Sequence, residues 1–267
     1  MHQVDAIGTV HRPVRHDEVP RIVCLVPSIT ELLCDLGLAP FLVGRTGFCI
    51  HPRELVQSIP KVGGTKDVNV EKIRRLAPTH LVVNIDENEK PTVETLAQFI
   101  PNVIVTHPLA PRDCLDLYRL LGGIFNAMPA AEGLCRSFET EYAALKALPA
   151  QAPQTLVYCI WKDPWMTVSA DTYIARMMAE IGWHAWAVPG NAARYPVFDW
   201  SQARAAIDGV LLSSEPYRFT DAHVQALQKE IGKPVRLVDG EMMSWYGSRA
   251  IEGLRYLRVL RMQGGGA

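Results

Sequence analysis

Residues 129–149 contain the feature that most constrains the fold of this chain, an isolated helical pattern bounded by prolines. Apolar residues recur at steps of three and four positions, and charged residues fill the faces between them; the apolar set is Leu134, Phe138, Tyr142, Leu145 and Leu148. Pro129 suits a first helical turn because its missing N–H is not needed there, and Pro149 stops the pattern. We expect a helix of about twenty residues, roughly 30 Å long.

Short runs rich in Val, Ile and Leu alternate with helical patterns on both sides of this helix. We expect strands at residues 21–26, 42–45, 80–84, 102–108, 155–160, 209–213 and 235–238, and helices at 28–37, 70–77, 93–99, 173–182, 221–232 and about 247–261. Ser28 followed by Glu31 predicts a capping box, and Asn69 predicts an N-cap. The closing residues 263–267 are expected to fray.

This alternation predicts an α/β fold of two lobes with mostly parallel sheets, joined by a single long helix, with a ligand cleft between the lobes. The expected boundaries are residues 1–127 for the first lobe, 128–150 for the linking helix and 151–267 for the second lobe. A length of 267 residues with 48% hydrophobic residues suffices for two cores.

Charge and cysteine usage exclude several classes of partner. The net charge is −1 and there is no run of Lys and Arg, so neither nucleic acid nor an acidic membrane is expected to bind. The six cysteines show no CxxC or other metal-ligand spacing and are expected to be reduced core residues. The first twenty residues contain no apolar stretch typical of a secretory signal, which predicts a cytoplasmic protein; a mis-assigned start would instead leave a periplasmic one.

In open α/β sheets, ligands bind beyond the carboxyl ends of the strands, so the residues that follow each expected strand are candidate contacts. All six tryptophans follow the central helix. Trp161, Trp165 and Trp245 fall in loops after strands, where broad rings would suit a large flat ligand. The other three, Trp183, Trp186 and Trp200, are expected in the core or at its rim.

Catalytic motifs are absent from the sequence, which has no GxSxG, GxxxxGK[ST], HExxH or GxGxxG after a strand. No metal site is expected. One enzymatic alternative stays open, in which Cys49 and His51 act with Glu215 near the cleft of a cytosolic enzyme.

Long segments of the chain resemble a known family. They read RIVCLVPSITELLCDLGL, LVGRTGFCIHP, IPKVGGTKDVNVEKIRRLAPTHLVVN, PWMTVSADTYI and VDGEMMSWYGSRAIEGL. The pattern resembles the substrate-binding proteins of vitamin B12 and iron-siderophore ABC importers, the helical-backbone metal receptors. The resemblance implies two α/β lobes joined by one long helix, and a binding protein for a metal chelate such as a corrinoid, haem or a ferric siderophore. It implies no catalytic residue and no intrinsic cofactor.

The resemblance also implies particular contacts with the ligand. Phe48, Trp161, Trp165 and Tyr195 occupy places similar to the aromatics that enclose the corrin in B12-binding members. Glu241 looks like the family's polar cleft residue, and Thr65 stands where those members have a tryptophan. Their positions after strands add Glu215 and Trp245 to the expected ligand-binding residues.

An ABC permease is the protein partner that the resemblance implies. Glu71 matches the first-lobe glutamate that docks onto permease arginines, whereas Ser201 falls at the second docking position. One of the two acidic residues expected to dock onto the permease is therefore missing. The protein itself is expected to be a monomer.

Overall fold

The computed structural model describes residues 3–263, which divide into two compact units. The first unit contains the chain up to Pro108 together with Arg112–Phe138 and Tyr246–Arg249. The second unit contains Leu109–Pro111, Glu139–Trp245 and the chain from Ala250 onward. The expected fraying of the chain end falls mostly on residues 264–267, outside the described part.

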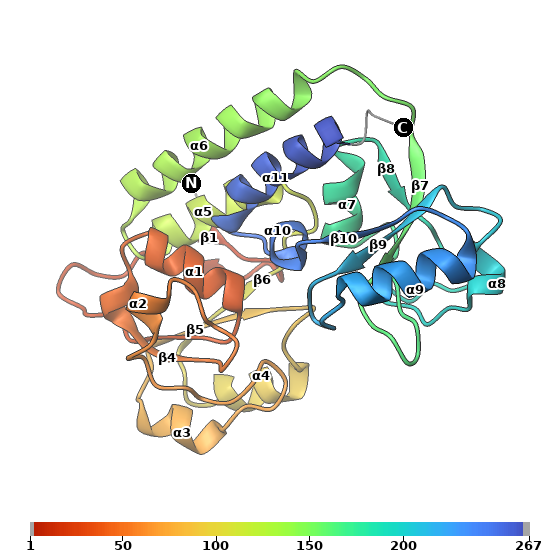
Figure 1. Ribbon diagram of the computed structural model, residues 1–267. Helices are drawn as coiled ribbons and strands as arrows, with labels where there is room; N and C mark the ends of the chain where they lie inside the picture. Colours follow the sequence, from red (N-terminus) through yellow and green to blue (C-terminus); the bar gives the residue numbers. More distant parts are fainter. Residues whose placement is uncertain (1–2, 264–267) are drawn as a thin grey trace. The chain divides into compact units, whose positions relative to one another are not determined.

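The first unit is built on a four-stranded parallel sheet with the order β4-β3-β5-β6 (Figure 1). Every residue of β3 and β5 is buried, because helices cover both faces of the sheet. The strands are β3 (Ile22–Cys24), β4 (Leu42–Arg45), β5 (His80–Asn84) and β6 (Asn102–Thr106). The helices are α1 (Pro27–Asp35), η1 (Ala39–Phe41), α2 (Arg53–Val56), α3 (Val70–Arg75), α4 (Lys90–Ala97) and α5 (Asp113–Ile124).

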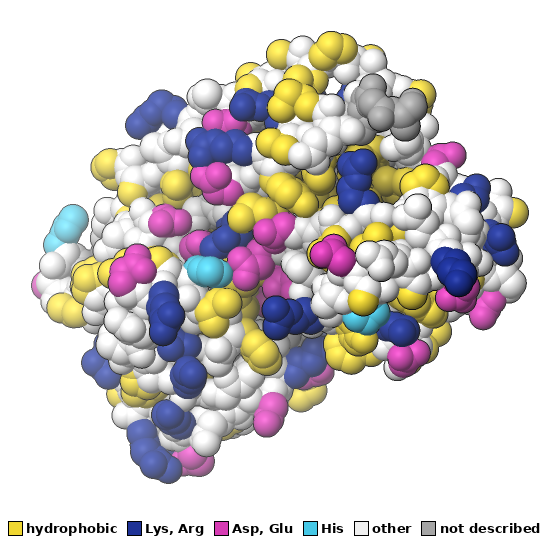
Figure 2. All heavy atoms as spheres, in the orientation of Figure 1, with side chains coloured by type: hydrophobic (Ala, Val, Ile, Leu, Met, Phe, Trp, Pro, Cys, Tyr) yellow, Lys and Arg dark blue, Asp and Glu magenta, His cyan; other side chains and the backbone are white. Residues whose placement is uncertain are grey.

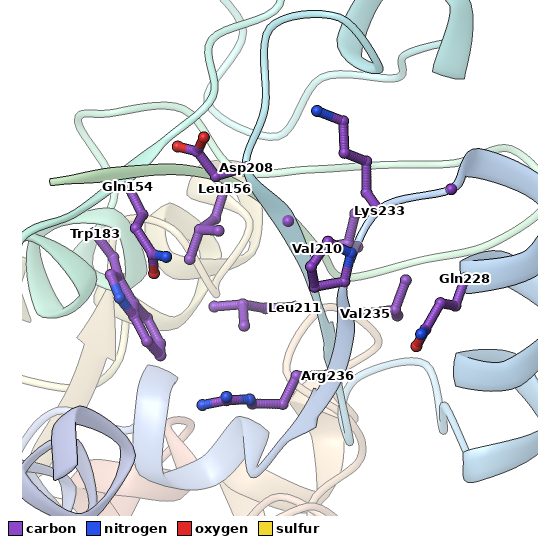
Figure 3. A pocket seen from close by; sticks show the side chains of 13 residues that line it. Gln154, Leu156, Trp183, Asp208, Val210, Leu211, Gln228, Lys233, Val235 and Arg236 are labelled. Atoms are coloured by element: carbon purple, nitrogen blue, oxygen red, sulfur yellow. The ribbon is translucent and has the colours of Figure 1, made fainter. Parts of the chain in front are cut away.

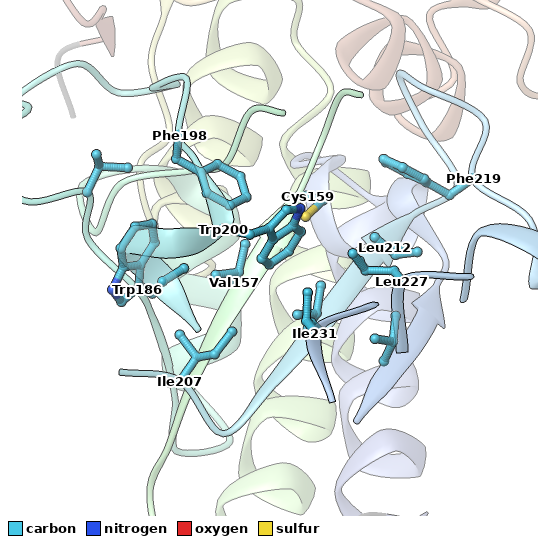
Figure 4. Packing of buried hydrophobic residues seen from close by; sticks show 14 residues of the cluster. Val157, Cys159, Trp186, Phe198, Trp200, Ile207, Leu212, Phe219, Leu227 and Ile231 are labelled. Carbon is cyan, nitrogen blue, oxygen red and sulfur yellow. The ribbon is translucent and has the colours of Figure 1, made fainter. Parts of the chain in front are cut away.

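The second unit is built on another four-stranded parallel sheet, with the order β10-β9-β7-β8. One face packs on aromatic and aliphatic side chains that include Trp186, Phe198 and Trp200, so these tryptophans are buried as expected (Figure 4). The strands are β7 (Gln154–Cys159), β8 (Trp183–Ala185), β9 (Gly209–Ser213) and β10 (Val235–Val238). The helices are α7 (Tyr173–Ala179), α8 (Trp200–Ala203), α9 (Asp221–Ile231), α10 (Gly240–Ser244) and α11 (Arg249–Gln263).

The two sheets share one topology. In each, the first strand along the chain lies between the second and the third, and the fourth lies at the far edge. The prediction of two α/β lobes with parallel sheets is therefore confirmed. Helix α6 (Met128–Lys146) occupies almost the whole range expected for the long helix, and the two units divide within it, after Phe138. The lobe boundaries at 127/128 and 150/151 stay a prediction.

The capping box expected at Ser28 is wrong. Pro27 already occupies the first turn of α1, so Val26 becomes the N-cap and Ser28 lies inside the helix. Glu31 instead accepts two hydrogen bonds from Arg249, at 2.8 and 2.6 Å. The cap at Asn69 is confirmed, since its side chain accepts a 2.8 Å hydrogen bond from the Lys72 N–H.

Helix α5 was missed because Gly122 and Gly123 weaken its helical pattern. Both glycines allow close packing. A Cβ on Gly122 would lie 2.6 Å from the Ala131 Cβ of α6, and one on Gly123 would collide with the Gln3 side chain. Packing inside the first unit therefore outweighs the low helix propensity of these two positions.

A hairpin at the start of the chain closes the free edge of the first sheet. Its strands are β1 (Gln3–Val4) and β2 (Val10–His11), and the Asp5 carboxylate lies at its centre. Asp5 accepts hydrogen bonds from the backbone N–H groups of Ile7, Thr9 and Val105 at 3.1, 2.8 and 3.0 Å, and lies 3.1 Å from His11 Nε2. Because Val105 belongs to edge strand β6, the hairpin satisfies backbone groups that would otherwise be open to another chain.

We expect Asp5→Ala to lower the free energy of unfolding by about 3 kcal/mol, because it leaves a buried histidine and three backbone donors without their acceptor. Urea unfolding followed by circular dichroism measures this. Asp17→Ala is the matched control, since Asp17 pairs with Arg15 at the surface, where such a pair contributes at most about 1 kcal/mol. An equal decrease in the free energy of unfolding in the two variants would show that the hairpin does not stabilise β6.

Candidate ligand-binding site

Each sheet has one position where ligands are expected, set by its strand order. Neighbouring strands whose connections leave in opposite directions open a crevice at their carboxyl ends. In the first unit these strands are β3 and β5, and in the second they are β7 and β9. The side chains that follow these four strands form the candidate site, and each unit is described separately.

In the first unit, Asn88 ties the loops at the carboxyl edge together. Its Nδ2 donates to the carbonyl oxygens of Leu25 at 3.2 Å and Thr65 at 2.9 Å, and its Oδ1 accepts from the Asn84 N–H at 2.9 Å. Thr65, a predicted ligand contact, is thereby held beside the end of β3, half-buried. Asn88 was not among the predicted site residues.

Phe48 presents its ring to solvent at this edge, with 62% of the residue exposed. A Cβ on Gly64 would lie 3.4 Å from Phe48 Cε2, so the ring rests against the glycine backbone. Gly63 has φ +117, and a Cβ there would collide with the Asp67 carbonyl. The double glycine therefore shapes a turn on which Phe48 lies. Ile50 and Ile85 add further exposed apolar surface.

In the second unit, four aromatic side chains form a continuous series, which we call the aromatic shelf: Trp161, Tyr217, Phe219 and Trp165. Trp161 meets Tyr217 edge to face at 5.5 Å, Tyr217 packs on Phe219 at 4.6 Å, and Phe219 stacks on Trp165 at 5.8 Å. Trp165 in turn contacts Trp200 in the core. Trp161 is the exposed end of the shelf, at 41%, whereas Trp165 is half-buried.

Backbone pairing places further side chains beside the shelf. Residues 160–166 form a tight hairpin, with the Ile160 N–H donating to the Met166 carbonyl at 3.0 Å. The segment 194–198 pairs with the outer side of this hairpin through Met166 and Val197. Tyr195 and Val197 are both exposed there. Met166 therefore lies between Trp161 and the segment that carries Tyr195, all on the same unit.

Glu215 is the polar centre of the second unit's edge. It follows β9, and its Oε1 accepts hydrogen bonds from Ser244 Oγ at 3.0 Å and Trp245 Nε1 at 2.8 Å. Burial raises the pKa of the carboxyl above its usual range, and the two hydrogen bonds oppose that rise. Gly240 makes room for the arrangement, since a Cβ there would lie 2.5 Å from Glu215 Cγ.

The predicted residues thus divide into exposed and supporting ones. Phe48, Trp161 and Tyr195 are exposed, and Glu241 is half-buried in the first turn of α10. Trp245 is buried, and its indole N–H is bound to Glu215. Tyr217 and Phe219 were missed, although they follow β9 closely and aromatic residues in a loop after a strand were the signal used for Trp161.

The enzymatic alternative fails at its nucleophile. Cys49 is fully buried, and its sulfur lies 3.1 Å from the hydroxyl oxygens of Thr30 and Thr46. Burial raises the pKa of the thiol, which disfavours the reactive thiolate. Cys49 is therefore a structural residue. Within residues 3–263, the structure brings together no group of three or more His, Cys, Asp or Glu side chains that could hold a metal ion.

Residues 22–226 match the periplasmic binding protein family, and the chain belongs to that family. It is a binding protein and not an enzyme.

Individual relatives agree with this family. A vitamin B12-binding protein of Vibrio vulnificus (strain CMCP6) is 23% identical over 206 residues, which cover 77% of this chain and 72% of that protein. The periplasmic vitamin B12 binding protein BtuF of Vibrio cholerae has a similar fold, with a TM-score of 0.75, 16% identity, and coverage of 93% of this chain and 98% of that one. The periplasmic heme-binding protein RhuT from Roseiflexus sp. RS-1 also has a similar fold, with a TM-score of 0.76 and 19% identity. The match covers 92% of this chain and 99% of that one.

Nothing in these comparisons supports the expected cytoplasmic location. The family and both structural relatives carry the word periplasmic in their descriptions. Among residues 3–263, no helix is both long and apolar enough to cross a membrane.

The buried carboxyl of Glu215 predicts a dependence of stability on pH. Because its pKa is higher in the folded than in the unfolded protein, the folded state binds the proton more tightly, and stability is lost as the pH rises through the folded pKa. Glu215→Gln removes this loss. The unfolding free energy of the variant minus that of the wild type should therefore rise from about pH 4 to about pH 7.

Chemical denaturation at several pH values measures this difference. Glu54→Gln, which changes an exposed carboxylate in the first turn of α2, is the control for the general effect of removing a negative charge. A difference for Glu215→Gln that falls or stays level with pH would contradict the predicted cost of burying the charge.

Proposed function

We propose that this protein binds a corrinoid, and that the carboxyl edge of the second unit's sheet supplies the main contact surface. The observation that carries the proposal is the aromatic shelf, which leaves the Trp161 ring exposed while Tyr217, Phe219 and Trp165 support it from the core. A rigid, exposed aromatic surface is costly to leave in water and suits a broad, partly apolar macrocycle. Phe48 offers a second exposed ring, on the first unit.

The polar groups at these edges include oxygen acceptors that suit the amide side chains of a corrinoid. The second unit contributes carboxylates at Glu215 and Glu241, and the first contributes Asp86 and the Asn88 amide. Corrinoid side chains end in amides, which can donate to such oxygens. Haem propionates and most ferric siderophores are anionic and are held best by Arg and Lys. Lys162, whose Nζ lies 6.0 Å from the centroid of the Trp165 ring, is a cation in the same hairpin as Trp161. These amide and carboxylate oxygens, and not the net charge of the edges, therefore support a corrinoid.

Thr65 argues for a different packing of the ligand in the first unit. The tryptophan expected at this position is replaced by a small residue, and Thr65 is fastened through its carbonyl to Asn88. Phe48 supplies exposed aromatic area there, with 62% of the residue exposed. The second unit contributes the exposed Trp161 ring, which the other three rings of the shelf hold in place.

We expect Trp161→Ala to weaken cyanocobalamin binding about tenfold, because a stacked ring contributes on the order of 1 kcal/mol beyond the area that it buries. Calorimetric titration measures the dissociation constant. The fold should remain intact, since Trp161 lies at the exposed end of the shelf; Trp165→Ala, by contrast, should also lower stability, because Trp165 packs on the core.

Tyr142→Ala, which removes an aromatic ring from α6, is the matched control and should bind cyanocobalamin as the wild type does. Haemin and ferrichrome are titrated in parallel. Tighter binding of either, or normal cyanocobalamin binding by Trp161→Ala, would contradict the proposal.

We also propose that the loaded protein delivers its ligand to an ABC importer, which requires a location on the side of the membrane from which the ligand enters. Glu71 supports a docking role. It lies in the first turn of α3, its side chain is 68% exposed, and the nearest cation, Arg74, is 3.5 Å away. Figure 2 shows acidic and basic side chains side by side over α3. An exposed carboxylate of this kind can meet a permease arginine.

Asp199 supplies the charge that Ser201 lacks in the second unit. Along the chain, helix α8 directly precedes the third strand of its sheet, β9. Helix α3 directly precedes the third strand of the first sheet, β5, so the two helices are topologically equivalent. Asp199 caps α8, and its Oδ1 accepts from the Ser201 N–H at 2.8 Å. Hydrogen bonds from Ser201 lower the pKa of Asp199, so it is negative at neutral pH. We infer that Glu71 and Asp199 form the docking pair.

The double variant Glu71→Gln/Asp199→Asn should reduce corrinoid uptake by the cell's importer in proteoliposomes about tenfold or more, because two charge-assisted contacts are lost. Asparagine retains the capping ability of Asp199. Cyanocobalamin affinity should be unchanged. Asp221→Asn, in the first turn of α9, is the control. Normal uptake with the double variant would exclude this pair.

A further inference from the structure

A cavity of about 570 Å³ lies in the second unit, away from the carboxyl edge described above. Its lining comes from the amino-terminal ends of β7, β9 and β10, from β8, and from the turn between α9 and β10 (Figure 3). Trp161 and Glu215 follow the opposite ends of β7 and β9. The cavity is therefore separate from the proposed corrinoid site, and its size is that of a site for a small organic molecule.

The register of the sheet places apolar side chains along one wall of this cavity. Gln154 pairs with Trp183, Leu156 with Gly209, and Leu211 with Arg236, so these side chains project from one face of the sheet. Leu156, Leu211 and Trp183 are almost completely buried and form the wall. A Cβ on Gly209 would lie 3.1 Å from the Pro234 carbonyl oxygen and 3.3 Å from Leu156 Cδ2, so the glycine lets these two residues approach the strand closely.

Arg236, in the lining of the cavity, has a hydrogen-bond donor that the apolar wall does not satisfy. Its Nη1 is buried, and among the described residues 3–263 it has no hydrogen-bond partner. The one carboxylate in the lining, Asp208, is engaged elsewhere, since its Oδ2 accepts from the Thr155 N–H at 2.7 Å. Figure 3 shows the Arg236 side chain extending below Leu211 toward the Trp183 ring. A buried guanidinium N–H without an acceptor is costly, and a bound anion would remove that cost.

The rest of the rim determines what kind of anion fits. Lys233 and Gln228 line the outer part of the rim, with the Lys233 side chain directed away from Arg236, and Gln154 adds an amide beside Trp183. The only aromatic side chain in the lining is Trp183, and the other walls are aliphatic. A bare inorganic anion would leave that apolar surface uncovered. A flat hydrophobic body with one carboxylate would satisfy both parts.

We propose that this cavity is a second ligand site, which binds a small planar aromatic carboxylate. The carboxylate accepts from Arg236 Nη1, and the ring lies on Leu211 and Leu156 beside Trp183. The proposal goes beyond corrinoid binding and does not depend on it, because the lining of the cavity contains none of the residues assigned to the corrinoid site.

Nuclear magnetic resonance titration with indole-3-acetate tests the site in the whole chain. The indole N–H signal of Trp183 is assigned by its absence in Trp183→Phe. We expect this signal to shift on titration, and we expect the neutral analogue tryptophol to bind at least about tenfold more weakly, because it cannot accept a charge-assisted hydrogen bond. No shift at Trp183, or equal affinity for the two compounds, would overturn the proposal. The affinities of indole-3-acetate and tryptophol are both measured on the wild-type protein.

Arg236→Gln should abolish the preference for the carboxylate over the alcohol. Arg12→Gln, an exposed arginine of the first unit's hairpin, is the matched control and should leave the preference unchanged. Persistence of the preference in a folded Arg236→Gln variant would overturn the assignment to Arg236. Repeating the titration with saturating cyanocobalamin should give the same affinity, whereas competition between the two ligands would show that indole-3-acetate occupies the corrinoid site instead.

Discussion

Parallel pairing of short, fully buried strands is the constraint on which the rest of this structure depends. Strands β3, β5 and β9 are buried at every residue. Such strands need cover on both faces, and their connections must therefore return through helices. All the carboxyl ends of one sheet then lie along one edge, which gathers residues as distant in sequence as Trp161 and Tyr217 into one series of rings.

The two units use this edge in different ways. In the first unit the edge is shaped mainly by backbone, through the turn at Gly63 and Gly64 and the carbonyls bound by Asn88. In the second unit it is shaped by rings and by a buried carboxylate at Glu215. A backbone turn sets a position for Phe48 without adding area, whereas the stacked rings add a broad surface. The shared topology thus supports two kinds of ligand contact.

Buried polar groups separate the parts of the molecule that are complete from the parts that are open to a ligand. Asp5 has four partners and closes a sheet edge, and the Arg249 pair with Glu31 is held by two short hydrogen bonds. These groups stabilise the fold because each donor has its acceptor. Arg236 differs, since its buried Nη1 lacks a partner among residues 3–263 and lies in the lining of a cavity. The same physical rule thus explains a structural contact and indicates a binding site.

The sequence by itself predicted seven of the eight strands of the two parallel sheets, because periodicity and turn residues act over short distances, and it did not predict β8. It predicted β4, β5, β9 and β10 at their observed bounds, and placed α6 within a few residues. It did not predict α5, whose glycines are favoured only by close packing against Ala131 and Gln3. It also placed Phe48, Trp161 and Glu215 after strands, and so at carboxyl edges.

Only the tertiary structure decided what those side chains do. Cys49 and Trp245 occur in loops where the sequence suggested chemistry or ligand contact, yet both are buried and bonded to neighbours. Burial and hydrogen-bond partners depend on residues far along the chain, such as Thr30 for Cys49 and Glu215 for Trp245. The unpartnered nitrogen of Arg236 depends in the same way on the register of β9 and β10, a long-range pairing that local pattern does not encode.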